Sequence, residues 1–182
     1  MNIVLLHPHD IFDAREPWTI RIESLAIEFA RKGHEVTLIH FINETSIEKY
    51  TRHKAGFKIV SLRRHGGVRL FCKNMQDILA EIKHADIIHF QKCFHYVCLP
   101  ALCGSLLYGK AVHYDWDDLE EAIYQASHHP HNWFIHFFIK TFERVIPLIV
   151  DTISVASVAL REKCLRWGIP AYKVYTAPVG AD

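Results

Sequence analysis

The sequence predicts an α/β fold: a Rossmann-like, doubly wound, mostly parallel sheet of about seven strands with helices on both faces. Two observations lead to this prediction. Short apolar runs alternate with segments of helical periodicity along all 182 residues, and half of the residues are hydrophobic, enough for a substantial core. Glycines follow several of the helical segments, where a left-handed cap is favoured.

The short apolar runs are expected to be strands, over residues 3–6, 35–41, 57–62, 86–90, 111–114, 152–155 and 173–176. The spacing of apolar residues predicts helices over 18–32, 70–83, 97–108, 120–125, 133–148 and 158–167. The polar stretch 43–55 is expected to be a loop or a short helix. Because no linker or repeat interrupts this pattern, residues 1–182 are expected to form a single domain.

Charge and cysteine content narrow the classes of function. Lys plus Arg (21) nearly balance Asp plus Glu (20), so the composition gives no electrostatic reason to expect nucleic acid as a partner. No segment resembles a signal peptide or reaches the ~20 apolar residues of a membrane-spanning helix. Zinc or disulfide spacing is missing among the cysteines, so reduced thiols of a cytoplasmic protein are expected at Cys72, Cys93, Cys98, Cys103 and Cys164.

Two nucleotide-binding signatures are missing from the sequence. Neither a Gly-x-Gly-x-x-Gly turn after the first strand nor a P-loop occurs, which argues against a dehydrogenase or an ATPase. His128, His129 and His131 lie close together but lack a regular spacing and a nearby cysteine, so a solvated loop is expected there. Neither a metal nor another cofactor is expected.

Polar residues follow several of the predicted strands. In an open parallel sheet, ligands bind beyond the carboxyl ends of the strands. Carboxylates there can accept hydrogen bonds from sugar hydroxyls, and an arginine can bind a phosphate through two hydrogen bonds. Lys92 and His7 belong to the same loops. The candidate substrate-binding residues are His9, Asp10, Arg15, Arg21, Gln91, His95, Asp117, Asp118 and Ser157.

The run from Asp115 to Asp118 contains three carboxylates and has two interpretations. Adjacent carboxylates repel one another, so one of them can have a raised pKa and act as a base. Alternatively, Asp117 or Asp118 caps the helix that continues through Glu120 and Glu121. Both can hold for different residues. Similarly, His9 with Asp10 either binds a ligand or caps its loop.

Two other segments have alternative interpretations. The basic turn with Arg63, Arg64 and Arg69 is either a solvated turn or a site for phosphate or an anionic surface. The helix over 133–148 either packs against the sheet or makes peripheral contact with a membrane. Its bulky apolar residues cover more than one stripe; they are Trp133, Phe134, Phe137, Phe138 and Phe142.

Four segments, taken in order, resemble retaining glycosyltransferases of the GT-B architecture, of the family 4-like (group 1) kind. "RIESLAIEFARKGHEVTLI" resembles their first βαβ unit, "ADIIHF" their fourth strand and "KAVHYDWDDL" their fifth strand with its acceptor-facing loop. "DTISVASVALREKCLRWGIPAYKVYTAPVGAD" resembles the passage toward the second domain. The chain departs from the family in its first loop, residues 7–17, which contains no glycine, and at Val179, where the family has asparagine.

The resemblance implies that residues 1–182 form the acceptor-side N-terminal domain, and that a donor-binding C-terminal domain, absent from this chain, supplies the nucleotide site. The full enzyme would transfer a sugar, with retention, from a nucleotide diphosphate-sugar to a glycan or lipid-linked acceptor. It would act in the cytoplasm or at the inner face of the cell membrane, and this chain alone would be inactive or nearly so.

Asp115 takes its predicted role from the same resemblance. Aligned with the family, it stands where many members have a site histidine after the fifth strand, so Asp115 is expected to be the catalytic residue. The alternative to an enzyme part is a non-catalytic, glycosyltransferase-like binding protein that pairs with a separate donor-domain chain.

Overall fold

The computed structural model describes residues 1–13, 19–43, 49–127 and 132–178. They build one eight-stranded sheet with the order β3-β4-β2-β1-β5-β6-β7-β8, in which every neighbouring pair is parallel except β3 and β4. The predicted Rossmann-like architecture is therefore confirmed. The strands are β1 (Asn2–His7), β2 (Glu35–Ile42), β3 (Lys49–Lys54), β4 (Phe57–Arg63), β5 (Ile87–Gln91), β6 (Ala111–Trp116), β7 (Thr152–Val155) and β8 (Val174–Thr176).

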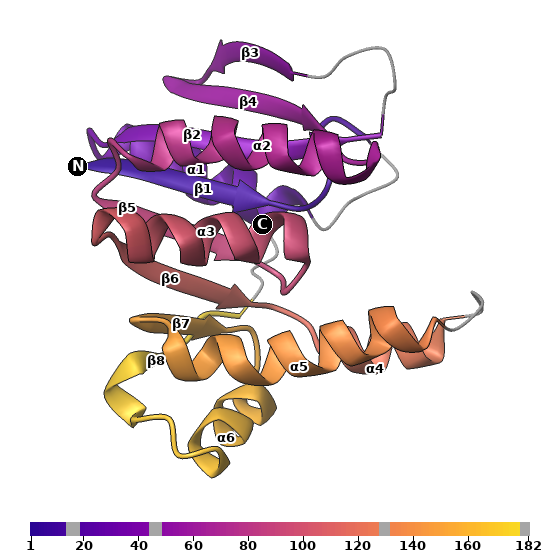
Figure 1. Cartoon of the computed structure of the whole chain (residues 1–182). Coiled ribbons are helices and arrows are strands. Elements are labelled where there is room, and N and C mark those ends of the chain that lie inside the picture. The colour runs from indigo at the N-terminus through magenta and orange to yellow at the C-terminus, as the bar shows by residue number, and fades with distance from the viewer. Residues whose placement is uncertain (14–18, 44–48, 128–131, 179–182) are drawn as a thin grey trace.

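Helices cover both faces of the sheet (Figure 1). One face packs against the first helix, and the other face packs against the second, third, fifth and sixth. The fourth and fifth helices extend beyond the carboxyl ends of the parallel strands (Figure 1). The helices are α1 (Ile20–Arg31), α2 (Gly67–Ile82), α3 (His95–Tyr108), α4 (Glu120–Ala126), α5 (Trp133–Ile149) and α6 (Val158–Arg166), with a short 3-10 turn at Ala171–Lys173.

The core has two layers because side chains alternate along each strand. In β1, Ile3 and Leu5 face α1, whereas Val4 and Leu6 face α2 and α3. Burial on both faces explains why these strands read as continuous apolar runs in the sequence. The described residues include no helix with the length and apolar character that crossing a bilayer requires.

The prediction of a loop or short helix over 43–55 is wrong for its second half. Lys49–Lys54 is an edge strand that pairs antiparallel with β4, and none of its side chains is buried. A tight turn joins the two strands, with Ala55 at φ 49° and Gly56 at φ 84°, as a type I′ hairpin requires. A charged edge strand buries no side chain against the core, so it leaves no hydrophobic period to detect.

All five cysteines are free, as predicted. Cys93, Cys98 and Cys164 are buried, and burial raises the pKa of each thiol. These thiols are therefore protonated at neutral pH and pack as small apolar side chains.

Candidate functional site

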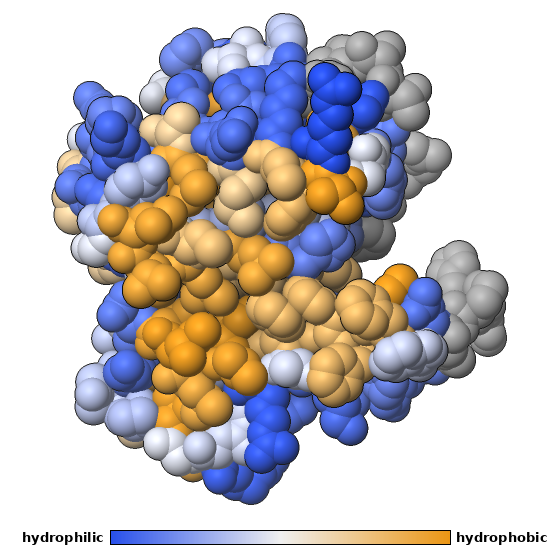
Figure 2. Space-filling model, viewed as in Figure 1, coloured by the Kyte–Doolittle hydropathy of each residue, from blue (hydrophilic) through white to orange (hydrophobic). Residues whose placement is uncertain are grey.

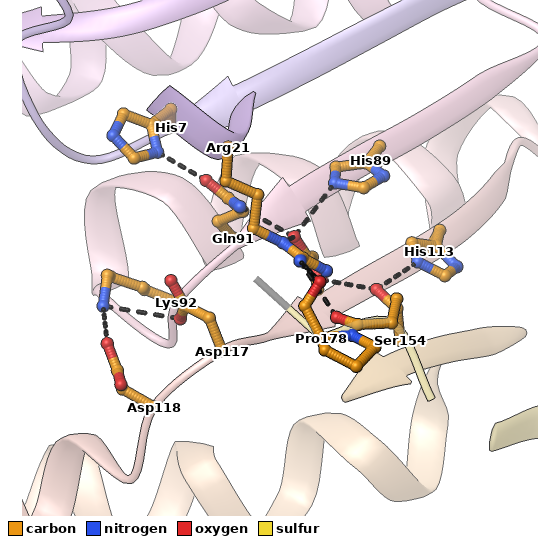
Figure 3. Close-up of polar contacts among 12 residues, drawn as sticks. His7, Arg21, His89, Gln91, Lys92, His113, Asp117, Asp118, Ser154 and Pro178 are labelled. Carbon is orange, nitrogen blue, oxygen red and sulfur yellow. Dashed lines mark hydrogen bonds and ion pairs between the residues drawn. The ribbon is translucent and has the colours of Figure 1, made fainter. Parts of the chain in front are cut away.

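The candidate site lies where β1, β5, β6 and β7 end. These four strands are neighbours in the sheet and parallel, so their carboxyl ends meet along one edge. The register pairs Gln91 with Asp115, and Asp115 with Ser154. Their side chains, with that of Arg21 from α1, converge on the α1 side of the sheet (Figure 3).

Asp115 is completely buried and accepts hydrogen bonds from three side chains. Arg21 donates from Nε to Oδ2 (2.7 Å) and from Nη2 to Oδ1 (2.8 Å), a bidentate pair. Gln91 donates from Nε2 to Oδ2 (2.7 Å), and Ser154 donates from Oγ to Oδ1. We call Asp115 and these three partners the Asp115 cluster. It joins α1 to three strands around one carboxylate.

The donors around Asp115 determine how its pKa moves. Burial alone would raise the pKa of this carboxyl, but the hydrogen bonds and the charge of Arg21 hold it well below its usual range. Arg21 also donates from Nη1 to the carbonyl oxygens of Ala177 (2.9 Å) and Pro178 (3.3 Å). Asp115 is therefore ionised and its acceptor positions are filled, which suits a positioning role better than proton transfer.

The cluster extends to His7 and fixes the tautomer of that ring. The amide nitrogen of Gln91 donates to Asp115, so its oxygen faces Nδ1 of His7, 2.7 Å away, and the ring must donate that proton. Burial lowers the pKa of His7 well below its usual value, with a further contribution from His9. His7 is consequently neutral, with its Nε2 unprotonated.

Two stacked histidines lie beside the Asp115 cluster. The rings of His89 and His113 are 4.9 Å apart, and His113 shares hydrogen bonds with Thr152 Oγ1 (2.8 Å) and Ser154 Oγ (2.9 Å). Burial lowers the pKa of His113 to about 3. His89 and His113 are not among the site residues predicted from the sequence. The pattern that could have indicated them is the recurrence of polar residues at alternate positions of three neighbouring strands.

A second group of charges surrounds Lys92, which follows β5 in a left-handed conformation (φ 63°). The ammonium lies 2.6 Å from Glu120 Oε1, 3.1 Å from Asp118 Oδ2 and 3.4 Å from Asp117 Oδ1. We call these four residues the Lys92 cluster. Its three carboxylates lie close enough together to hold a cation, and the Lys92 ammonium, itself buried, lies against them.

Charge and burial act in opposite directions within the Lys92 cluster. Burial would lower the pKa of Lys92, but the carboxylates outweigh it and raise the pKa. Burial raises the pKa of Asp117 and of Glu120, since one ammonium offsets only part of the cost of three neighbouring carboxylates. The carboxylate with a raised pKa that the run 115–118 predicts is thus Asp117 and not Asp115.

The capping interpretation of Asp117 and Asp118 is wrong. The residue before α4 is Leu119, and no side chain of this loop caps the helix. Glu143 of α5 does so from outside: it accepts from the backbone N of Glu120 (2.8 Å) and Glu121 (3.3 Å), and from the Trp116 indole (3.2 Å). Asp117 and Asp118 instead point toward the Lys92 ammonium.

Residues 19–182 match the profile of Glycosyltransferase Family 4. The chain belongs to this family. Among solved structures, it is similar to sucrose-phosphate synthase from Thermosynechococcus elongatus, with 15% identity and a TM-score of 0.68 over 100% of this chain and 49% of that one. The predicted resemblance to GT-B glycosyltransferases is confirmed. No curated protein sequence matches the chain.

Other structures similar to this Family 4 domain contain UDP. Staphylococcus aureus MnaA, solved with UDP, is 9% identical with a TM-score of 0.64 over 96% of this chain and 44% of that one. HepE from Anabaena, solved with UDP and glucose, is 15% identical with a TM-score of 0.60 over 100% and 45%. At such identities the likeness shows the fold alone. The chain spans about half the length of these proteins.

The remaining predicted residues of the Family 4 domain lie outside both clusters. Asp10 Oδ1 accepts from the backbone N of Phe12 (3.0 Å), a loop cap, and lies 3.5 Å from His40 Nδ1. The ring of His9 lies 5.5 Å from that of His7, at the edge of the Asp115 cluster. Ser157 accepts from the backbone N of Leu160 (3.2 Å) and thereby caps α6.

His95 lies on the other side of the sheet from Arg21, between α2 and α5. Its ring contacts Phe71 (5.8 Å) and Phe138 (5.7 Å), and burial lowers its pKa. It is therefore not part of either cluster. Arg15 lies outside the described residues, as do the histidines of the predicted loop at 128–131.

Proposed function

We propose that this chain is the acceptor-binding N-terminal domain of a retaining glycosyltransferase. The enzyme would transfer a sugar from a nucleotide diphosphate-sugar to a glycan or lipid-linked acceptor, in carbohydrate biosynthesis in the cytoplasm. Family membership supports the reaction class. The observation that supports the acceptor role is the Lys92 cluster, where three carboxylates share one ammonium at the ligand-binding edge of the sheet.

Asp118 is the carboxylate best placed to bind an acceptor hydroxyl. Its side chain is 50% exposed, whereas those of Asp117 and Glu120 are each 8% exposed. An ionised carboxylate offers about four acceptor positions, and the 3.1 Å contact with Lys92 occupies one of those on Asp118. The others can receive sugar hydroxyls through charge-assisted hydrogen bonds.

Asp115 and Asp117 have different roles in this proposal. Asp115 is a positioning residue, since Arg21, Gln91 and Ser154 fill its acceptor positions. Asp117 has a pKa raised by burial, so it is the better proton acceptor when an acceptor hydroxyl attacks the sugar. In this proposal the Lys92 cluster contains the candidate base, and the neighbouring Asp115 cluster takes no proton.

The donor site would belong to a second domain. The chain spans about half the length of HepE and MnaA, both solved with UDP, and its first loop lacks the glycines that would let backbone amides approach a phosphate. Closure of two domains around both substrates would exclude water from the reaction.

A transfer assay tests this function. Residues 1–182 alone, and the full product of the gene, would be incubated with a panel of nucleotide diphosphate-sugars and with glycan and polyprenyl-phosphate acceptors. Mass spectrometry would detect the product and NMR its anomeric configuration. We expect transfer with retention by the full product and little or none by residues 1–182.

Two results would contradict this expectation. Transfer by residues 1–182 at a rate comparable to that of a two-domain relative would show that the site is complete within this chain. A gene product that ends at Asp182 and binds acceptors without transfer would favour pairing with a separate donor-domain chain.

A further inference from the structure

The outer face of α5 is unusually apolar for a surface helix. Ile139 and Ile146 face the core, yet large side chains on the opposite side are open to solvent. Trp133 is 78% exposed, Phe134 60% and Phe137 61%, and the exposed apolar face continues through Leu148 and Ile149 to the end of the helix. A surface helix normally has an apolar stripe only toward its core, so this second face indicates a contact outside the domain.

An apolar groove adjoins this face. It has a volume of about 360 Å³ and lies between α2, α3 and α5, where its walls include Phe71, Leu99 and Phe138. Figure 2 shows one apolar area that runs across α3 and along α5 on this side of the molecule. Leu106 and Leu107 at the end of α3 are 87% and 64% exposed. We call the outer face of α5 together with this groove the α5 surface.

Most of the charged residues around the α5 surface are basic; Glu121 of α4, 3.7 Å from Lys140, is an acidic exception. α3 contains no Asp, Glu, Lys or Arg. On α5 the exposed charged residues are Lys140 and Arg144, while its one acid, Glu143, is buried. The groove shares Phe71, His95 and Tyr96 with a second hollow that also contains Arg64. A third hollow, beside the second, is lined by Arg63, Arg69 and Lys73, and no acidic residue lines any of the three.

We propose that the α5 surface docks on an anionic lipid bilayer. Trp133, Phe134 and Phe137 would enter the interface between headgroups and acyl chains, the preferred depth of amphipathic aromatic helices. Lys140, Arg144 and the basic turn before α2 would lie among the anionic headgroups. A second copy of the chain fits less well, because a symmetric contact would bring the basic residues of both copies to one interface, and no acidic residue lines the three hollows to pair with them.

This proposal does not depend on sugar transfer, and vesicle sedimentation tests it without substrate. The fraction of the chain that sediments with vesicles would be measured for phosphatidylcholine vesicles and for vesicles that also contain phosphatidylglycerol, at low and at high salt. We expect binding mainly to the anionic vesicles, weakened by salt. The double variant Trp133→Ser, Phe137→Ser should bind about tenfold more weakly or worse, since about 25 cal/mol per Å² of buried apolar area is lost.

Matched variants distinguish binding through the α5 surface from nonspecific binding by exposed aromatic side chains. Tyr172→Ser with Tyr175→Ser removes two aromatic side chains that are 74% and 56% exposed on another part of the domain, and should leave binding unchanged. Lys140→Gln with Arg144→Gln should reduce the preference for anionic vesicles but not abolish it, because the basic turn before α2 remains.

Three results would overturn the proposal. The first is that the wild-type chain sediments with neither kind of vesicle, or equally with both. The second is that the Tyr172 and Tyr175 control loses as much binding as the Trp133 and Phe137 variant. The third is that sedimentation velocity shows dimerisation that the Trp133 and Phe137 variant abolishes, which would assign the α5 surface to a second copy of the chain.

Discussion

The Asp115 cluster and the Lys92 cluster lie side by side at the same edge of the sheet but have opposite compositions. In the first, one carboxylate receives hydrogen bonds from Arg21, Gln91 and Ser154. In the second, one ammonium contacts three carboxylates. Donors are in excess around Asp115, and acceptors are in excess around Lys92.

This difference separates a framework from a binding site. A buried carboxylate whose acceptor positions are filled can be replaced only at a large cost, and has nothing left to offer a ligand. A group of carboxylates with too few donors has spare acceptor positions, and burial raises the pKa of two of its members, Asp117 and Glu120. Polar ligands that bring hydroxyl donors therefore suit the Lys92 cluster, although the Asp115 cluster has the stronger hydrogen bonds.

The largest effect on stability is expected from Asp115→Asn. The substitution leaves Arg21, whose side chain is 11% exposed, without its counter-charge, so the free energy of unfolding should fall by about 3 kcal/mol or more. Urea denaturation measures this loss. Glu28→Gln, which removes a surface partner of Arg31, is the control and should leave the midpoint unchanged. An equal midpoint for Asp115→Asn and wild type would show that the Asp115 cluster is not a framework.

Lys92→Met should have the next largest effect. The variant leaves three carboxylates without their ammonium, but Asp118 is half-exposed and can recover solvent, so a loss of about 2 kcal/mol at pH 7.5 is expected. Lys49→Met, which removes an ammonium from a single surface pair with Asp77, is the matched control. A loss no larger than that of the control would contradict the assignment of Lys92 as the counter-ion of the cluster.

The two clusters should also respond differently to pH. The folded pKa of Asp115 lies below the ~3.9 of an unfolded aspartate, so its contribution is present above that pH and constant up to neutrality. For Asp117 and Glu120 the folded pKa lies above the unfolded value, so the stability gained from protonation is lost as the pH rises. Lys92→Met raises these values further.

It follows that acidification from about pH 7.5 to 5.5 should shrink the loss caused by Lys92→Met and leave that of Asp115→Asn unchanged. Urea denaturation of both variants across this range measures the contrast. Parallel pH profiles for the two variants would mean that the clusters titrate as one unit.

The smallest effect on stability is expected from Asp118→Asn, at about 0.5 kcal/mol or less, because the side chain is half-exposed. Acceptor binding should nevertheless weaken about tenfold, since a charge-assisted hydrogen bond is replaced by a neutral one. Calorimetric titration with the acceptor found in the transfer assay measures this change. Glu35→Gln, which changes an exposed carboxylate at the start of β2, should affect neither quantity, and unchanged affinity in Asp118→Asn would remove this residue from the site.

Much of the fold could be predicted from the sequence, because the buried parallel strands are mostly apolar and the helices between them have an apolar period. Ile3–Leu6, which is buried on both faces, illustrates this. β3 could not be predicted in the same way: the strand is stabilised by backbone pairing with β4 and by the turn at Ala55 and Gly56, neither of which leaves a side-chain pattern.

The site could be predicted in part. The rule that ligands bind at the carboxyl ends of parallel strands selected Arg21, Gln91 and Asp115, which do meet. Their partnership was beyond the sequence, because Arg21 and Asp115 are 94 positions apart and only the sheet brings them together. For Asp10 the sequence offered both a ligand role and a loop cap, and the structure shows the cap. The role of Ser157 as a cap depends on the direction of a backbone N–H group, which residue type alone does not give.

Glu143 gives the loop between β6 and α4 an unusual constraint. The same carboxylate accepts from Trp116, just before this loop, and from Glu120 and Glu121, just after it. Asp117 and Asp118 therefore lie in a short segment, and the residues at both of its ends donate hydrogen bonds to the Glu143 carboxylate of α5. These hydrogen bonds restrict the conformations of the segment before a ligand binds, so that binding costs less conformational entropy. They also link the position of the two aspartates to that of α5.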